Sequence, residues 1–430
     1  MSAEDYTPIF KLPVYKNRNK KRPLRNGLEI SNTFTSRKSV YLNRVNVVIF
    51  GFGLIGRKLV ERIVACRDLH KSVCHLQHSV NAIFDSQGYI YNGDALGNAT
   101  GLSDGTLIQA IEWKQKQNSL RVFRDAGYYM NDFEVHFVFC FFFLRCKKLR
   151  TLLLFFVVMQ RMRVNLLSEK TILVDCTNCS DELEYAFTQH SKKGGGVVFA
   201  NKKPLWPRVH RFGYSAALGG SSQFINTISN LINSGDTIWY LEGIVSSFWN
   251  YVLSNYKCGS TRFSDLCVEA HKKGLSMSDI REDLAGLDLA RTLLKCFYDM
   301  IPIELFWNPN INVYDFMKHL RSLDHSIDQY LAQKQSANSH GKGNLRCIVK
   351  MNCETETLAI DIESINEDSE YQMAKNDMCA LKIYTDVYKK ENNEHLFITG
   401  KGAGPDVTVN GVLMDLNRVA YVMDNDTLNN

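Results

Sequence analysis

Short apolar runs alternate with helix-like patterns in the first half of the chain. The run at 45–50 precedes a glycine-rich turn, after which Leu59, Ile63 and Val64 recur at helical spacing. Further apolar runs lie at 79–84, 172–175 and 196–199, with helical patterns between them at 104–116 and 181–189. This alternation predicts an α/β fold with a parallel sheet.

A second series of elements follows. One helical pattern covers 314–333 and another covers 407–422. Strand-like segments lie at 345–351, 357–362, 380–384 and 396–399. We therefore expect a second α/β domain built on a mixed sheet, and a last helix that returns to the first domain.

The segment 133–159 fits neither series. Its two apolar runs are separated by a strongly basic stretch, and each is well short of the roughly 20 residues that a membrane-spanning helix needs. A membrane-surface hairpin, an extra helix on the sheet and non-native sequence such as a translated intron are alternative interpretations. The segment carries neither helix caps nor turn signals, which favours non-native sequence, and we expect no membrane-spanning helix.

Composition narrows the class of protein. With 430 residues, 45% of them hydrophobic and 22% charged, the chain is long enough for two domains. Much of the net charge of +6 lies in 1–44, a basic stretch typical of a flexible tail, and the charge indicates no nucleic-acid partner. Twelve scattered cysteines and the lack of a secretory signal favour the cytoplasm, and organellar targeting by the basic tail stays open.

The turn at 51–56, Gly-Phe-Gly-Leu-Ile-Gly, lies between a predicted strand and a predicted helix. In a dinucleotide-binding turn the first glycine permits the tight turn, the second lets the backbone approach a pyrophosphate, and the third allows close helix–strand packing. We therefore expect the pyrophosphate at the N-terminus of this helix, held by Gly51, Gly53, Leu54, Ile55 and Gly56.

Two features concern the choice between NAD and NADP. Asp85 directly follows the 79–84 run, close to where a ribose-binding acid belongs. Arg57 and Lys58 follow the glycine turn and are placed to meet a 2′-phosphate instead. The expected cofactor is NADP or NAD, and the preference stays open.

The stretch 279–296 carries an apolar stripe at helical spacing. Asp288 lies one helical step from this stripe, where an ionised carboxylate costs several kcal/mol unless something pairs with it. Two interpretations are open for Asp288. It is either a carboxylate on the helix flank that reaches solvent or Arg291, or a carboxylate directed into a pocket.

Several further motifs occur in a set order. They are Asp175-Cys-Thr-Asn178, Ala200-Asn-Lys-Lys-Pro204, Leu241-Glu-Gly-Ile244, Asn250-Tyr-Val-Leu253, the stretch 279–291 and the segment 402–412. Together with the glycine turn, they resemble the homoserine dehydrogenase family, including the dehydrogenase half of bifunctional aspartokinase/homoserine dehydrogenases. The resemblance covers about 45–425 apart from the 133–159 segment, and we identify no kinase region.

The resemblance implies a fold and a reaction. We expect a Rossmann-type NAD(P)-binding domain at 45–210, a mixed-sheet α/β substrate and dimerisation domain at 211–395, and a segment at 396–430 that returns to the cofactor domain. The implied reaction is hydride transfer between NAD(P) and the homoserine/aspartate 4-semialdehyde pair, in threonine, methionine and isoleucine biosynthesis. The implied assembly is a homodimer.

The same resemblance assigns roles to residues. Lys202 matches the family's lysine beside the nicotinamide and the substrate, and Asp288 matches its active-site aspartate, so we expect both to be catalytic. Asp283 matches a substrate-contacting aspartate. Further cofactor contacts are expected at Thr177, Asn178, Gly402 and Gly404.

Several positions depart from the family pattern. Thr292 occupies the position of a candidate catalytic lysine, and threonine cannot act as an acid/base at neutral pH. Among the substrate-binding positions, Met277 replaces a glutamate that binds the substrate amino group, and Leu275 replaces a tyrosine. Ser247 and Phe248 replace glycine and a small hydroxyl residue, so Phe248 would fill space meant for substrate. Two hypotheses compete: an active enzyme, with this or an altered substrate, and a catalytically degenerate homologue that keeps cofactor binding.

The segment 215–220, Ser-Ala-Ala-Leu-Gly-Gly, resembles the family's monovalent-cation loop. That loop binds sodium or potassium mostly through backbone carbonyls. The corresponding ligands here would be Ser215, Leu218 and Gly220, although Ser215 replaces the acidic first residue of the family's loop.

Overall fold

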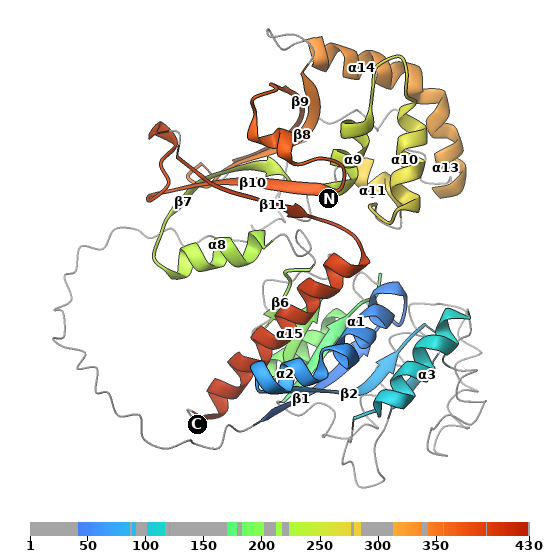
Figure 1. The fold of residues 1–430 in the computed structure, drawn as a ribbon, viewed down its shortest axis with the longest axis vertical. Helices are drawn as coiled ribbons and strands as arrows, with labels where there is room; N and C mark the ends of the chain where they lie inside the picture. The colour runs from blue at the N-terminus through green and yellow to red at the C-terminus, as the bar shows by residue number, and fades with distance from the viewer. Residues whose placement is uncertain are drawn as a thin grey trace, which may run out of the picture.

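In the part of the chain that the structure describes, helices pack against two β-sheets (Figure 1). The computed structural model describes residues 42–86, 88–91, 101–116, 120, 170–178, 183–201, 212–216, 223–276, 279–284, 313–336, 343–355, 357–392 and 394–428. Nearly all of the predicted tail and the whole 133–159 segment lie outside the described residues.

The first sheet has the strand order β3-β2-β1-β4-β5-β6. Its strands are β1 Asn43–Phe50, β2 Leu76–Phe84, β3 Tyr89–Tyr91, β4 Thr171–Asp175, β5 Gly196–Phe199 and β6 Phe212–Gly213. All neighbouring strands are parallel except the β2–β3 pair. The register aligns Phe84, Phe50, Asp175 and Phe199, so four strands end at one edge. In open α/β sheets, ligands bind outside this carboxyl edge.

Helices cover both faces of the first sheet. Alternate residues of β1 point to opposite faces, so Val47 and Ile49 pack with α1 (Leu54–Ala65), α3 (Asp104–Gln115) and α15 (Pro405–Leu428). Val48 and Phe50 pack instead with Phe187 of α7 (Glu184–Lys192). The short α2 (Arg67–Val73) follows α1 and contacts β2. With both faces covered, β1 is a near-continuous apolar run, as the sequence pattern predicted.

The second sheet has the order β11-β10-β7-β8-β9. Its strands are β7 Ile238–Ile244, β8 Asn344–Asn352, β9 Thr357–Ile365, β10 Met378–Thr385 and β11 Leu396–Lys401. We expected a mixed sheet here, but every neighbouring pair is antiparallel. The reason is the connections: only a few residues separate the end of β8 at Asn352 from the start of β9 at Thr357, and short connections join antiparallel strands. The mixed sheet of the fold is therefore the first one.

Helices also pack against the second sheet. They are α8 (Phe224–Asn233), α9 (Ser247–Asn255), α10 (Phe263–Lys272), α11 (Ile280–Leu284), α13 (Val313–Leu320) and α14 (Asp324–Ser336), with the 3-10 turns Arg321–Leu323, Glu370–Met373 and Lys390–Asn392. Trp249 and Phe263, both fully buried, lie in the core between α9, α10 and β8. Helix α15 then crosses from β11 to the first sheet, where it contacts α1, β5 and β6 (Figure 1).

The expected fold class is thus confirmed, including the return of the last helix to the first sheet. In the described part of the chain, no helix combines the length and apolar character needed to cross a membrane.

Candidate active site

The glycine turn lies at the carboxyl end of β1, directly before α1. Gly51 has a φ of +92°, and a Cβ there would lie 2.5 Å from the Cys176 carbonyl oxygen. A Cβ at Gly56 would overlap the Gly51 carbonyl oxygen. A Cβ at Gly53, in contrast, would meet no protein atom within 4 Å. Two of the glycines are therefore required by packing, whereas the open side of Gly53 leaves space for a ligand at the N-terminus of α1.

Three other residues of the turn surround this opening. Leu54 is 53% exposed, and Ile55 packs partly against the core of the first sheet. The Arg57 Nε donates a hydrogen bond of 3.2 Å to the Gly53 carbonyl oxygen. The Arg57 charge is therefore held beside the turn, as a role in phosphate binding requires.

Asp85 lies at the end of β2, as predicted, but its carboxylate already has protein donors. The Lys114 Nζ of α3 lies 2.5 Å from one carboxylate oxygen, and the Gly88 N–H donates to the other at 2.9 Å. The Asp85 side chain is only 5% exposed. A ribose hydroxyl would therefore share Asp85 with Lys114, a residue that the sequence pattern did not single out.

Asp175 organises the next part of the edge, at the end of β4. Its Oδ1 accepts hydrogen bonds from the Thr177 N–H at 2.8 Å and the Thr177 hydroxyl at 2.7 Å. Its Oδ2 accepts one from the Asn201 Nδ2 at 3.3 Å. Burial raises the pKa of Asp175 to about 6, because an ionised carboxylate is poorly solvated there. The Thr177 backbone lies beside Gly51 of the glycine turn, and Asn178 is exposed.

The second glycine turn connects β11 to α15. A Cβ at Gly402 would overlap the Cys379 Sγ and lie 2.7 Å from the Ser247 Oγ. Gly404 has a φ of +118° and open space where its Cβ would be. Each glycine is thus needed, Gly402 for close packing and Gly404 for its backbone conformation.

The two glycine turns are joined directly. The Lys58 Nζ of α1 lies 2.7 Å from the Asp406 Oδ1 in the first turn of α15. The pair brings the first turns of α1 and α15 together, so the two glycine turns that precede these helices lie near each other.

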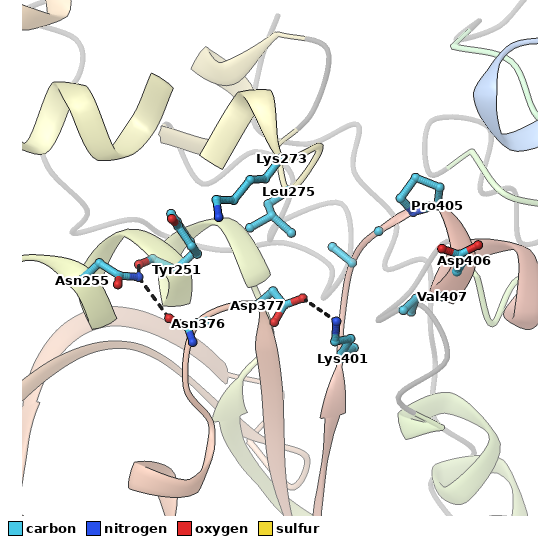
Figure 2. Close-up of a pocket in the computed structure, with 12 residues that line it drawn as sticks. Tyr251, Asn255, Lys273, Leu275, Asn376, Asp377, Lys401, Pro405, Asp406 and Val407 are labelled. Carbon is cyan, nitrogen blue, oxygen red and sulfur yellow. Dashed lines mark hydrogen bonds and ion pairs between the residues drawn. The ribbon is translucent and has the colours of Figure 1, made fainter. Parts of the chain in front are cut away.

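A cavity of about 590 Å³ adjoins this site (Figure 2). It is bordered by α9, the end of α10, the turn before β10 and the β11–α15 turn. Its polar or charged walls include Tyr251, Lys273, Asp377 and Lys401, and Leu275 and Gly404 also line it. A small polar substrate is of a size and character to enter such a space.

Among the predicted substrate residues, Leu275 lines the cavity directly. Ser247 is buried, and its hydroxyl donates a hydrogen bond of 2.9 Å to the Asp377 carbonyl oxygen. Phe248 was expected to fill substrate space, but it is 1% exposed and packs in the helical core against Trp249. Phe248 therefore packs in the core of α9 and α10, and its expected effect on substrate space stays a prediction.

The stretch that follows α10 is described only in part. Asp283 in α11 is buried, and its backbone carbonyl accepts a hydrogen bond of 2.9 Å from the Trp249 Nε1. Asp279 pairs with Arg281, whose Nη2 lies 2.6 Å from the Asp279 Oδ2. Of the predicted catalytic and substrate-binding residues, those outside the described ranges are Lys202, Met277, Asp288 and Thr292.

Ser215, from the predicted cation loop, is engaged by a carboxylate. Its N–H and hydroxyl donate to the two Asp415 carboxylate oxygens at 2.7 and 2.9 Å. Burial raises the pKa of Asp415, which is 1% exposed. Leu218 and Gly220 lie outside the described residues. Within the described ranges, no group of three or more His, Cys, Asp or Glu residues is arranged to hold a metal ion.

The cavity contains three charged residues that sequence reasoning missed: Lys273, Asp377 and Lys401. Each lies at or next to the end of a helix or strand, where the sequence pattern predicts a solvent-exposed residue. Neither spacing nor charge pattern distinguishes them from other surface residues. Only the packing of α9, α10, β10 and β11 brings them together.

Comparison with known proteins points in one direction. Residues 224–416 match the family model for homoserine dehydrogenase. The bifunctional aspartokinase/homoserine dehydrogenase 2 of Zea mays is 25% identical over 401 residues, covering 87% of this chain and 38% of the maize protein. The homoserine dehydrogenase of Emericella nidulans is 26% identical over 286 residues, covering 58% of this chain and 75% of the fungal enzyme. The chain thus spans well under half of the bifunctional relative that it matches.

Solved structures share the fold. A Candida auris protein described as of unknown function aligns with a TM-score of 0.60 and 19% identity, over 88% of this chain and 98% of that one. A hyperthermophilic archaeal homoserine dehydrogenase in complex with NADPH aligns with a TM-score of 0.57 and 18% identity, over the same shares of the two chains. The resemblance that the ordered motifs predicted is confirmed.

Proposed function

We propose that this chain, a relative of the homoserine dehydrogenases, is an NAD(P)-dependent oxidoreductase that interconverts aspartate 4-semialdehyde and homoserine. The observation that carries the proposal is the ion pair between Lys58 and Asp406. It holds together the helices that follow the two glycine turns, and a polar cavity lies beside the second turn. One turn has the form of a pyrophosphate cradle, and the other borders the space for a substrate. Together they provide what a hydride transfer between two bound molecules requires.

The residues of the first turn fit the cofactor. The open position at Gly53 is where a side chain would otherwise stand, and the backbone of 53–56 begins α1, whose N-terminus favours a phosphate. Thr177 and Asn178 border the same edge. When bound, the nicotinamide supplies or accepts the hydride. Arg57 and Lys114, both cationic and near the turn or Asp85, are the residues on which the NAD or NADP preference depends.

Each hydride transferred to the aldehyde carbon requires one proton to be delivered to the aldehyde oxygen. Reduction of the aldehyde places negative charge on its oxygen, and a nearby acid must donate a proton to that oxygen. We assign this role to Lys202, which follows the buried Asn201 in sequence, with Asp288 as the second catalytic residue, both on the family resemblance. Thr292 cannot take part as an acid at neutral pH, so the proposal assigns it no proton.

The proposal extends to the assembly and setting. We propose a homodimer that acts in the cytoplasm, in the biosynthesis of threonine and methionine. A sodium or potassium ion at the 215–220 loop would have to compete with the Asp415 contacts of Ser215.

The test is a direct assay of the purified chain. NAD(P)H absorbance is followed with aspartate 4-semialdehyde, alongside calorimetric titration of NADPH and NADH. Turnover with either cofactor supports the proposal. Cofactor binding without turnover, unchanged by Thr292→Lys and Met277→Glu together, would identify a catalytically degenerate homologue instead. Failure to bind either cofactor would contradict both functions.

A further inference from the structure

The turn at 374–378 is fixed in place by a buried amide of α9. Asn250 is 0% exposed, and its Nδ2 donates hydrogen bonds to the Ala374 carbonyl oxygen at 3.0 Å and the Met378 carbonyl oxygen at 2.8 Å. Asn376 has a φ of +55°, a left-handed conformation that asparagine tolerates better than most residues. The turn therefore holds Asp377 in one backbone position at the cavity.

Two further contacts hold the backbone of Asp377 itself. Its carbonyl oxygen accepts the Ser247 hydroxyl at 2.9 Å and the Gly402 N–H at 3.3 Å. Ser247 begins α9, and Gly402 belongs to the second glycine turn. Asp377 is thus tied both to the helix that carries the family motif at 250–253 and to the turn beside the cofactor site.

The cavity is lined by charged side chains of both signs, among them Asp377, Lys401 and Lys273 (Figure 2). The Lys401 Nζ lies 3.4 Å from the Asp377 Oδ2 on one side of the cavity. Lys273 lines the cavity from the end of α10, with its Nζ 5.3 Å from the centre of the Tyr251 ring and 3.4 Å from the Glu269 Oε1. The side chains of Lys273 and Lys401 are 50% and 65% exposed, so both can adjust to a ligand without loss of core packing.

An α-amino acid carries an ammonium and a carboxylate on one carbon, and a neighbouring carboxylate and ammonium complement that pair. Met277 and Leu275 stand where the family resemblance places the residues that hold the amino-acid end, and neither side chain carries a charge. Among the described residues that line the cavity, the carboxylates are Asp377 and Asp406, and Asp406 is paired with Lys58. Asp377 is the carboxylate next to a cavity lysine.

We propose that Asp377 binds the ammonium and that Lys401, assisted by Lys273, binds the carboxylate of an α-amino-acid substrate. This assignment rests on the proposed dehydrogenase function and names the residues that select its substrate. In this assignment the charged groups of the substrate are bound by residues at the ends of β10 and β11, and not by the α10–α11 connection, where the family resemblance places them. A zwitterion bound there lies beside Gly404 and the second glycine turn.

The experiment removes one charge from the protein and one from the ligand. Asp377→Asn and Lys401→Met are compared with wild type using three alcohols: homoserine, 4-hydroxybutyrate, which lacks the ammonium, and 3-aminopropan-1-ol, which lacks the carboxylate. For homoserine oxidation, each variant should raise KM about tenfold or more with kcat within about twofold. Asp377→Asn should leave binding of 4-hydroxybutyrate unchanged, and Lys401→Met should leave binding of 3-aminopropan-1-ol unchanged.

Lys318→Met is the matched control, because Lys318 is also 65% exposed and also pairs with an aspartate, Asp315, at 3.8 Å. Variants whose KM for homoserine equals that of this control would overturn the assignment while leaving the dehydrogenase function intact. A wild-type protein that binds NADP⁺ but neither binds nor oxidises homoserine would overturn both. Melting temperatures of the variants, which replace partly exposed side chains, verify that each is folded.

Discussion

The Lys58 ammonium of α1 lies 2.7 Å from the Asp406 carboxylate of α15, across 348 residues of sequence. Lys58 stands in the first turns of the helix that follows the first glycine turn, and Asp406 in the first turn of the helix that follows the second. The pair therefore links the cofactor cradle to the rim of the cavity. Its effect should be on the relative position of the two turns rather than on the stability of either sheet.

Lys58→Met should therefore weaken cofactor binding and leave the fold intact. The side chains of Lys58 and Asp406 are 34% and 70% exposed, so solvent screens the pair and its loss should change Tm little. We expect the KM for the cofactor to rise about threefold to tenfold, because the second turn loses its tie to α1. Steady-state kinetics and thermal denaturation measure the two effects. A large fall in Tm with unchanged cofactor KM would contradict this account.

Gly53 and Gly56 should respond in opposite ways to the same substitution. Gly56→Ala places a methyl group into the Gly51 carbonyl oxygen and should lower the free energy of unfolding by about 1–3 kcal/mol or more. Gly53 has a φ of −77° and open space at its Cβ, so Gly53→Ala should keep wild-type stability. It should nevertheless raise the Kd for NADPH about tenfold or more, because the methyl group occupies the approach to the pyrophosphate. Chemical denaturation and calorimetric titration distinguish the two. Equal losses of stability in both variants would show that the turn has no open side.

Much of the first sheet could be predicted from the sequence, because each buried strand is a short apolar run. The run at 45–50 became β1 Asn43–Phe50, and 196–199 became β5 Gly196–Phe199. The mixed character expected of the second sheet was wrong, because strand patterns do not encode direction. Direction follows from the connections, and the residues between Asn352 and Thr357 are too few for a parallel crossover, so β8 and β9 are antiparallel.

The candidate site divides in the same way. The glycine turn was predictable, since the spacing of Gly51, Gly53 and Gly56 has a backbone reason at each position. The position of Asp377 was not predictable, because the turn that carries it is held by Asn250. This residue lies on another element, 124 and 128 residues away in sequence from the two carbonyl groups that it binds. For Phe248, the sequence gives the motif position, whereas the packing of its side chain in the core depends on how α9 lies against α10.

Asn250→Asp should disrupt the 374–378 turn more than its near-identical shape suggests. The Nδ2 donates to two carbonyl oxygens, and a carboxylate oxygen in its place would be buried against both of them. We expect a loss of about 2–4 kcal/mol in the free energy of unfolding, because two acceptors lose their donor and a charge is buried. Denaturant unfolding measures it. The control is Asn255→Asp in the same helix, where the amide is only partly buried, and an equal loss there would contradict a special role for Asn250.

Asp175 should make stability fall as pH rises through the range from about 4 to 6. Its pKa is raised from 3.8 to about 6 by burial, so the folded state holds the proton more tightly than the unfolded state does. The contribution is fully present below pH 3.8 and is lost as pH passes 6, with a size on the order of 3 kcal/mol. Asp175→Asn, which cannot titrate, should remove this slope from the pH dependence of unfolding free energy. A variant with the wild-type slope would exclude Asp175 as its source.

His78 should act in the opposite direction over an overlapping range. It is 2% exposed in β2, its ring lies 5.1 Å from that of His70, and Arg67 donates to its carbonyl oxygen at 2.7 Å. Burial, followed by the nearby His70 and Arg67, lowers the pKa of His78 from 6.5 to about 4. The folded state therefore favours the neutral ring. Stability from this group is fully present above pH 6.5 and is lost as pH falls toward 4, by an amount on the order of 3 kcal/mol.

His78→Gln should remove the His78 contribution between pH 6.5 and 4, because glutamine has no charge to acquire, and should leave the opposing Asp175 contribution as a rise in stability as pH falls. The exposed His325 provides the matched control, and His325→Gln should keep the wild-type pH dependence. Urea unfolding at a series of pH values measures the slope for each protein. Since the Asp175 contribution rises over the same interval as pH falls, the double variant Asp175→Asn with His78→Gln should show less pH dependence than either single variant. If His78→Gln retains the wild-type acid sensitivity, the source lies in another group, and neutral burial of His78 is not what stabilises the sheet above pH 6.5.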